Sequence, residues 1–296
     1  MTSGIFEDFR SRGEEAIRTG QLVEAEDLYE RALLWAQENG EPWQIDLGLC
    51  NRAAVAIELG HGEGELPRLR EILVRNANPQ NCRLAAYNIS RYYELTKNYK
   101  KSLFYARIAL ERGETLGRRD WMASTHNHIG NVLLAESFVD EACQSYETAL
   151  SLMPDGHGVW CANILGNLGY CRVLQRRHSE GYTLLYKSLR MLRRFRAERY
   201  IVPTLLDLCF AHLETNHLRH AQRWGSLALQ LAAQTQQRDS VKNALYLLGE
   251  AAHLSGDSEG ARVYFTRLQR DFFPNEVYLP GFLMTVDIRK LINLHA

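Results

Sequence analysis

The sequence predicts an all-α protein, a solenoid of helical hairpins, and three observations support this prediction. A pattern of small and bulky residues recurs about seven times in the 296 residues, at intervals close to 40 residues. In each recurrence, two amphipathic helical patterns flank a short turn. After the last recurrence, residues 279–295 are apolar at helical spacing, which predicts a single capping helix over the end of the array.

We predict that these repeats form one continuous domain, 1–296, because each hairpin buries its apolar face only against its neighbours. The seven units begin near residues 6, 46, 83, 123, 162, 202 and 242. The clearest unit spans residues 123–154, where Gly130 and Ala142 are the small residues and Pro154 ends the unit.

The small residues stand where the two helices of a unit are expected to cross closely. A side chain larger than alanine would push the helices apart at this point. Because glycine in a helix interior costs roughly 1 kcal/mol relative to alanine, a glycine here indicates tight packing. Four units have one: Gly13, Gly130, Gly169 and Gly249.

The second unit departs from the pattern. Glu65 stands where the second helix normally begins with a small residue. Pro67 fits the first turn of a helix but would break its interior. We therefore predict a short second helix in this unit, over residues 66–75.

The offsets of the small and aromatic residues resemble those of the tetratricopeptide repeat. The longer interval is similar to the repeats of kinesin light chain, of the Pins/LGN spindle adaptors, and of bacterial Rap- and MalT-like regulators. The resemblance implies a right-handed superhelix whose first helices line a concave groove. It also implies a non-catalytic protein–protein interaction module that binds an extended peptide or a partner helix in that groove.

A row of polar residues runs through the predicted first helices. The sixth position of successive units holds Ser11, Asn51, Asn88, His128, Asn167, Asp207 and Leu247. Asparagine is a mediocre helix former because its side chain competes for backbone hydrogen bonds, so its repetition favours a specific role. A carboxamide can both donate to and accept from the backbone of an extended peptide. In the families that this sequence resembles, such a row binds peptides. The resemblance implies the same role for Asn51, Asn88 and Asn167. His128 and Asp207 depart from the asparagine pattern.

Neighbouring positions on the same face complete the candidate set. The predicted partner-binding residues are Asn51, Asn88, Arg91, Asn127, His128, Asn131, Asn163, Asn167, Tyr170, Asp207 and Phe210. Asn243 and Tyr246 occupy two further positions of this face in the last unit. The alternative is that these side chains only bridge neighbouring helices.

The sequence contains no constellation typical of catalysis or metal binding. It lacks a glycine-rich phosphate loop and the common nucleophile and zinc-protease motifs. His126 and His128 point about 200° apart on a helix, so they do not chelate one metal together. We therefore predict no enzyme activity, no catalytic residue, no metal site and no cofactor.

Composition narrows the function classes. Lys+Arg and Asp+Glu are both 35, a formal net charge of zero, which makes nucleic acid an unlikely partner. No segment predicts a membrane span or a secretory signal, and the six dispersed cysteines favour reduced thiols in a cytoplasmic protein. The basic stretch 188–200 is expected to be a solvated outer face, with an acidic partner surface as the alternative.

Two functions fit these observations. The first is the interaction module described above. The second is a signal-sensing regulator that binds a small peptide or metabolite and controls a separate effector. The sequence leaves open the identity of the partner and the oligomeric state.

Overall fold

The computed structural model of the chain describes residues 3–153, 158–289 and 293–294, and every regular element in these ranges is a helix. This confirms the predicted all-α class. Contacts between helices divide the chain into two compact units, residues 1–157 and 158–296. The sequence predicts that these two units form one continuous domain, and this stays a prediction.

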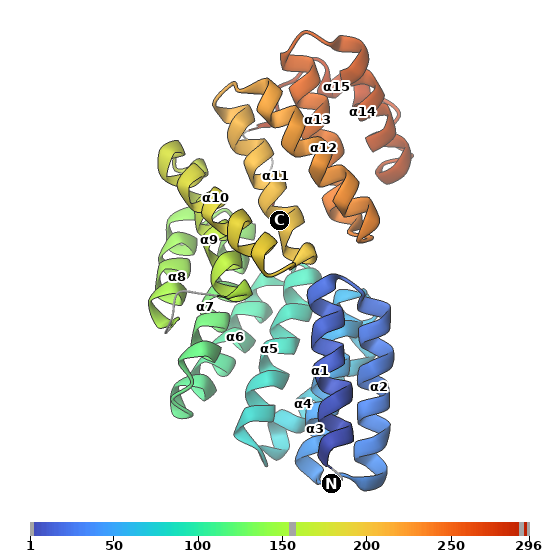
Figure 1. Cartoon of the computed structure of the whole chain (residues 1–296), viewed down its shortest axis with the longest axis vertical. Helices are drawn as coiled ribbons and strands as arrows, with labels where there is room; N and C mark the ends of the chain where they lie inside the picture. The colour runs from blue at the N-terminus through green and yellow to red at the C-terminus, as the bar shows by residue number, and fades with distance from the viewer. Residues whose placement is uncertain (1–2, 154–157, 290–292, 295–296) are drawn as a thin grey trace. The chain divides into compact units, whose positions relative to one another are not determined.

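The described residues of unit 1 form eight α-helices in four consecutive pairs, coloured blue to green in Figure 1. The helices are α1 (Ser3–Thr19), α2 (Leu22–Asn39), α3 (Pro42–Glu58), α4 (Leu66–Arg75), α5 (Pro79–Leu95), α6 (Tyr99–Thr115), α7 (Arg119–Ala135) and α8 (Val139–Leu152). A short 3₁₀ turn, Gly62–Glu65, precedes α4.

The described residues of unit 2 form three further pairs and one short helix (Figure 1). The helices are α9 (Val159–Leu174), α10 (His178–Arg194), α11 (Glu198–Glu214), α12 (Leu218–Gln234), α13 (Arg238–Leu254), α14 (Ser258–Phe272) and α15 (Leu279–Leu283).

First helices of neighbouring pairs pack on one another within each unit. Helix α5 contacts α3 and α7 in unit 1, and α11 contacts α9 and α13 in unit 2. These first helices therefore form one layer in each unit, and the residues of the polar row from Asn51 onward lie along it. The predicted unit starts fall three or four residues inside these helices, because the pattern begins at the first packing residue and not at the helix cap.

The close helix crossings confirm the register of the repeats. A Cβ atom added to Gly130 would lie 2.5 Å from Cε1 of Tyr146, sixteen residues later in the same pair. Gly13 meets the ring of Tyr29 in the same way, and Gly249 meets that of Phe265. Glycine is needed at these positions because an aromatic ring of the second helix fills the space of its missing side chain.

The irregular second repeat, which lies in unit 1, folds as predicted. Helix α4 spans Leu66–Arg75 with Pro67 in its first turn. The unexpected Glu65 has a structural reason, since its carboxylate accepts two hydrogen bonds from Arg52 at 2.8 and 3.0 Å. Arg52 also binds Glu30 of α2 at 2.8 Å. This pair of carboxylates ties the short α4 to the rest of unit 1.

The C-terminal segment differs from the prediction of a capping helix over residues 279–295. Helix α15 ends at Leu283, and residues 284–289 are not α-helical. The backbone N–H of Arg289 instead donates to Oδ1 of Asp287 at 3.0 Å, a local contact that competes with helical hydrogen bonding. Residues 290–292 and 295–296 lie outside the described part of the chain.

The six cysteines are buried and outside any disulfide, as the sequence predicts. Burial raises the pKa of the Cys50 and Cys209 thiols, so these groups are protonated packing residues and poor nucleophiles.

Candidate functional site

Several of the predicted residues of unit 1 are engaged between neighbouring helices. Asn88 on α5 is 2% exposed, and its side-chain N–H donates to the backbone carbonyl of Cys50 on α3 at 2.7 Å. Asn127 is buried as well, whereas Asn51 and Asn131 are half-buried. The Asn131 oxygen accepts a hydrogen bond from the Tyr146 hydroxyl at 3.0 Å.

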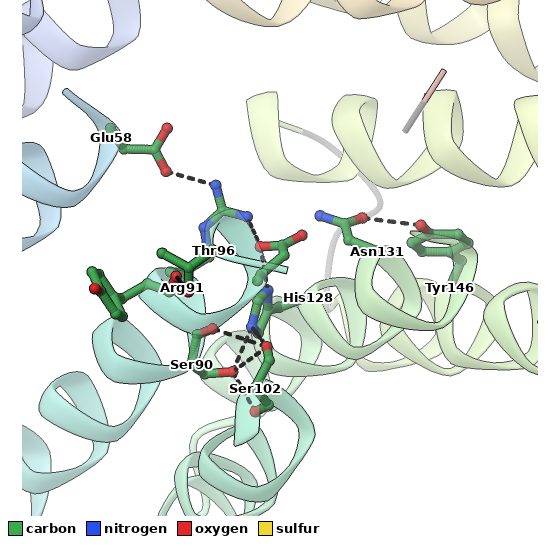
Figure 2. A network of polar contacts seen from close by, with 10 residues as sticks. Glu58, Ser90, Arg91, Thr96, Ser102, His128, Asn131 and Tyr146 are labelled. Carbon is green, nitrogen blue, oxygen red and sulfur yellow. Dashed lines mark hydrogen bonds and ion pairs between the residues drawn. The ribbon is translucent and has the colours of Figure 1, made fainter. Parts of the chain in front are cut away.

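A network of polar contacts surrounds the buried His128 on α7 (Figure 2). Its Nε2 lies 2.6 Å from the Ser90 hydroxyl, and its Nδ1 lies 3.3 Å from Oε2 of Glu94. Glu94 also pairs with Arg91, whose other partner is Glu58 of α3 at 2.6 Å. Burial raises the pKa of Glu94, but the positive charge of Arg91 and the contact with His128 outweigh it, so the pKa is lowered.

The order carboxylate, imidazole and hydroxyl in this network matches that of a catalytic relay. However, Ser90 is 0% exposed, and its hydroxyl donates to the carbonyl of Ser102 on α6 at 2.7 Å. A substrate cannot reach this oxygen, and its hydrogen is already engaged. We therefore assign the network to stability, as a polar bridge that joins α7 to α5 and α6.

In unit 2, the predicted residues lie on α9 and α11. Asn167, Tyr170, Asp207 and Phe210 are buried, and Asn163 is half-buried. The rings of Tyr170 and Phe210 are in contact, with centroids 5.5 Å apart. The structure thus brings Tyr170 and Phe210 together, and in unit 1 it groups Arg91 with His128 around Glu94.

The C-terminal segment contacts this layer of unit 2. The backbone N–H of Leu294 donates to the Tyr170 hydroxyl at 3.2 Å. The carbonyl of the same residue accepts from the side-chain N–H of Asn243, on α13, at 3.1 Å. Two side chains from different first helices therefore bind both polar backbone groups of one residue.

An acidic residue on the same layer is absent from the predicted set. Glu250 on α13 follows Tyr170 and Phe210 at intervals of 40 residues, a spacing that could have identified it. It is 2% exposed, and its Oε2 lies 3.9 Å from Nε of Arg289. Burial raises the pKa of Glu250 to about 7, an effect that Arg289 opposes and Asp287 reinforces. Within the described ranges, its Oε1 is buried without a hydrogen-bond partner.

A separate aromatic pocket of about 240 Å³ lies between α10, α11 and α12. Its lining residues are Tyr182, Tyr186, His212, His217 and His220. The two tyrosine hydroxyls lie 3.1 Å from Nδ1 and 3.0 Å from Nε2 of His212. Burial lowers the pKa of His212 to about 4, and the nearby His220 and His217 add to this effect.

Acidification is expected to destabilise unit 2 through His212 by about 2 kcal/mol between pH 7 and about 4.5. The folded pKa is about 4 and the ordinary value is 6.5, so the unfolded chain binds more protons between them and stability falls as the pH falls. The loss of stability on acidification, measured by urea unfolding, should be smaller in His212→Gln than in a protein that keeps His212. The contribution of Glu250 to the pH dependence has the opposite sign, so the reference protein and the His212→Gln variant should both carry Glu250→Gln. Identical pH dependence in the two would contradict the assignment.

No group of three or more His, Cys, Asp and Glu residues in the described part of the chain is arranged to hold a metal ion. Among the described helices, none combines the length and apolar character needed to cross a membrane.

No protein family model and no curated protein sequence matches the chain. Solved structures nevertheless share its fold. A Rap protein complexed with competence and sporulation factor gives a TM-score of 0.72 at 14% identity, covering 90% of this chain and 74% of that one. PilW, a type IV pilus biogenesis factor, gives 0.58 at 18% identity, covering 81% of this chain and 99% of that one.

A tetratricopeptide repeat protein from Parabacteroides merdae gives a TM-score of 0.52 at 13% identity, covering 94% of this chain and 97% of that one. At these identities the similarity concerns the fold. Together with the consecutive helical pairs, it shows that the chain has the tetratricopeptide-repeat fold and resembles the Rap proteins in it.

Proposed function

We propose that this protein is a non-catalytic interaction module that binds an extended segment of a partner protein along the first helices of its repeats. The contact of Leu294 with unit 2 carries the proposal. Tyr170 and Asn243 bind the N–H and C=O of one residue. Recognition of this kind depends on the backbone, so it tolerates many side chains.

The predicted residues contribute to this function in two ways. Asn88 and His128 are buried and bound to neighbouring helices, so they hold the first helices in position. Asn51 and Asn163 are half-buried on first helices, so their carboxamides can reach a bound segment. The fold similarity to a Rap protein complexed with competence and sporulation factor supports a role in binding proteins or peptides.

The test is a selection of twelve-residue peptides from a random library on the intact protein, followed by fluorescence anisotropy. Asn51→Ala and Asn163→Ala, made separately and together, should weaken the selected peptides by about tenfold for each bound carboxamide that is lost. Asn39→Ala is the matched control, because Asn39 is exposed on the second helix α2. Circular dichroism checks that each variant keeps its fold.

Peptides that bind the wild type, the two single variants and the double variant equally would contradict the proposal. A library that yields no peptide would contradict it as well. A cytoplasmic location is part of the same proposal, and the six buried cysteines, none of them in a disulfide, support it.

The second candidate function is a signal-sensing regulator that binds a small peptide or metabolite and controls a separate effector. The similarity to the Rap structure, at a TM-score of 0.72, favours it. A small ligand at 100 times its Kd stabilises the folded state by about 2.7 kcal/mol. A thermal-shift screen would therefore show a clear rise in Tm, whereas a module that requires a macromolecular partner would show none.

A further inference from the structure

The layer of unit 2 that contacts Leu294 also holds a buried acidic residue, Glu250, whose carboxylate is only partly paired among the described residues. We call Tyr170, Asn243 and Glu250 the tail site, since the C-terminal segment contacts all three. Glu250 is the acidic member of this site and is buried. A buried carboxylate is costly unless a cation and hydrogen-bond donors accompany it.

Among the described residues, the cation of the C-terminal segment that lies near Glu250 is Arg289, and it is shared. Nη2 of Arg289 lies 2.7 Å from the Asp287 carboxylate, while its Nε is 3.9 Å from Glu250. The Arg289–Asp287 pair is closer than the Arg289–Glu250 pair, so the guanidinium makes only a long contact with Glu250. Oε1 of Glu250 has no hydrogen-bond partner within the described residues, and the hydroxyl of the adjacent Tyr246 has none there either.

A guanidinium that is not held by its own neighbouring carboxylate would fit the tail site better. It could donate to both oxygens of Glu250, and paired N–H···O bonds of this kind are strong and directional. The backbone clamp of Tyr170 and Asn243 would hold the following residues as it holds Leu294. The site therefore favours an extended basic segment that has no acidic residue two positions before its arginine.

We propose that the tail site selects an extended segment with an arginine for Glu250, and that the chain's own C-terminal segment occupies the site until such a partner displaces it. This inference rests on the proposed function and specifies its partner and its regulation. A segment tethered in cis has an effective concentration in the millimolar range. It therefore raises the apparent Kd of a partner, which equals the intrinsic Kd divided by the fraction of time that the site is uncovered.

Two substitutions in the C-terminal segment should have opposite effects on a peptide added in trans. The probe is a fluorescent peptide with the sequence of residues 285–296, measured by anisotropy against the full chain. Arg289→Ala weakens the tether in cis and should raise the affinity for the probe by about tenfold. Asp287→Ala frees Arg289 for Glu250, strengthens the tether and should lower that affinity by about threefold.

Matched controls identify the site. Arg270→Ala removes an exposed arginine of α14 that pairs with Asp271 and should bind the probe as the wild type does. Arg289→Ala combined with Glu250→Gln should lose the gain in affinity. On the Arg289→Ala chain, a probe with alanine in place of its arginine should bind about tenfold more weakly than the original probe. A probe with alanine in place of its aspartate should bind more tightly.

Equal affinity of the wild type and Arg289→Ala for the probe would overturn the inference, and so would equal affinity of the arginine and alanine probes. The proposed function is judged separately, by the response of selected peptides to Asn51→Ala and Asn163→Ala. If those peptides respond but Arg289→Ala has no effect, the module binds peptides and the tail inference alone is wrong.

Discussion

Replacement of Gly130 by leucine is expected to lower the free energy of unfolding of unit 1 by about 3 kcal/mol or more. A Cβ atom alone at this position would lie 2.5 Å from the ring of Tyr146. Tyr146 is 0% exposed, so the ring has no free space into which it could move. The helices α7 and α8 would have to separate, which opens their packing along the whole pair.

Urea unfolding followed by circular dichroism measures this loss. Gly4→Leu is the matched control, because no atom lies within 4 Å of the position that its Cβ would take, and this variant should be nearly neutral. The cost of leucine at residue 130 should also be smaller in a Tyr146→Ala background, where the ring is absent. Additive effects of the two substitutions would show that the crossing is not where we place it.

Replacement of His128 by alanine is expected to cost about 3 kcal/mol of stability. The substitution removes a 0% exposed ring that contacts Tyr87 and leaves a cavity. It also removes the imidazole that Ser90 and Glu94 contact, although Glu94 keeps Arg91. The loss of packing and the loss of buried polar contacts act in the same direction.

His61→Ala is the control for this prediction. His61 is exposed and pairs with Glu26 at 2.6 Å, and exposed ion pairs contribute about 0–1 kcal/mol. Calorimetry of both variants should show a large fall in Tm for His128→Ala and a small one for His61→Ala. A stable His128→Ala variant would return this residue to the set of candidate partner contacts.

The two predictions differ in how far they depend on the structure. The close packing at Gly130 follows from the sequence, because the repeat pattern places a glycine where the two helices of a hairpin are expected to cross closely. That the ring of Tyr146 fills this space is seen only in the structure. The role of His128 does not, since a histidine at the sixth position fits both a partner contact and an internal bridge. Only its 0% exposure and its distances to Ser90 and Glu94 favour the bridge.

The candidate site shows the same division. The repeat positions led to Tyr170 and Asn243, which the structure places in contact with Leu294. They did not lead to Arg289, because residues 279–295 were expected to continue as a helix. Apolar spacing alone did not reveal that Asp287 would bind the N–H of Arg289 and that α15 would end at Leu283.

The sequence by itself determined the helical class, the register of the repeats and the short α4, because these depend on periodicity and on packing between helices that follow each other directly. The tertiary structure decided which polar residues are buried and what the C-terminal segment contacts. Asn88 and Cys50 are 38 residues apart, and Tyr170 and Leu294 are 124 apart. Such contacts depend on how several helices are stacked, and a local pattern of residues carries no record of that arrangement.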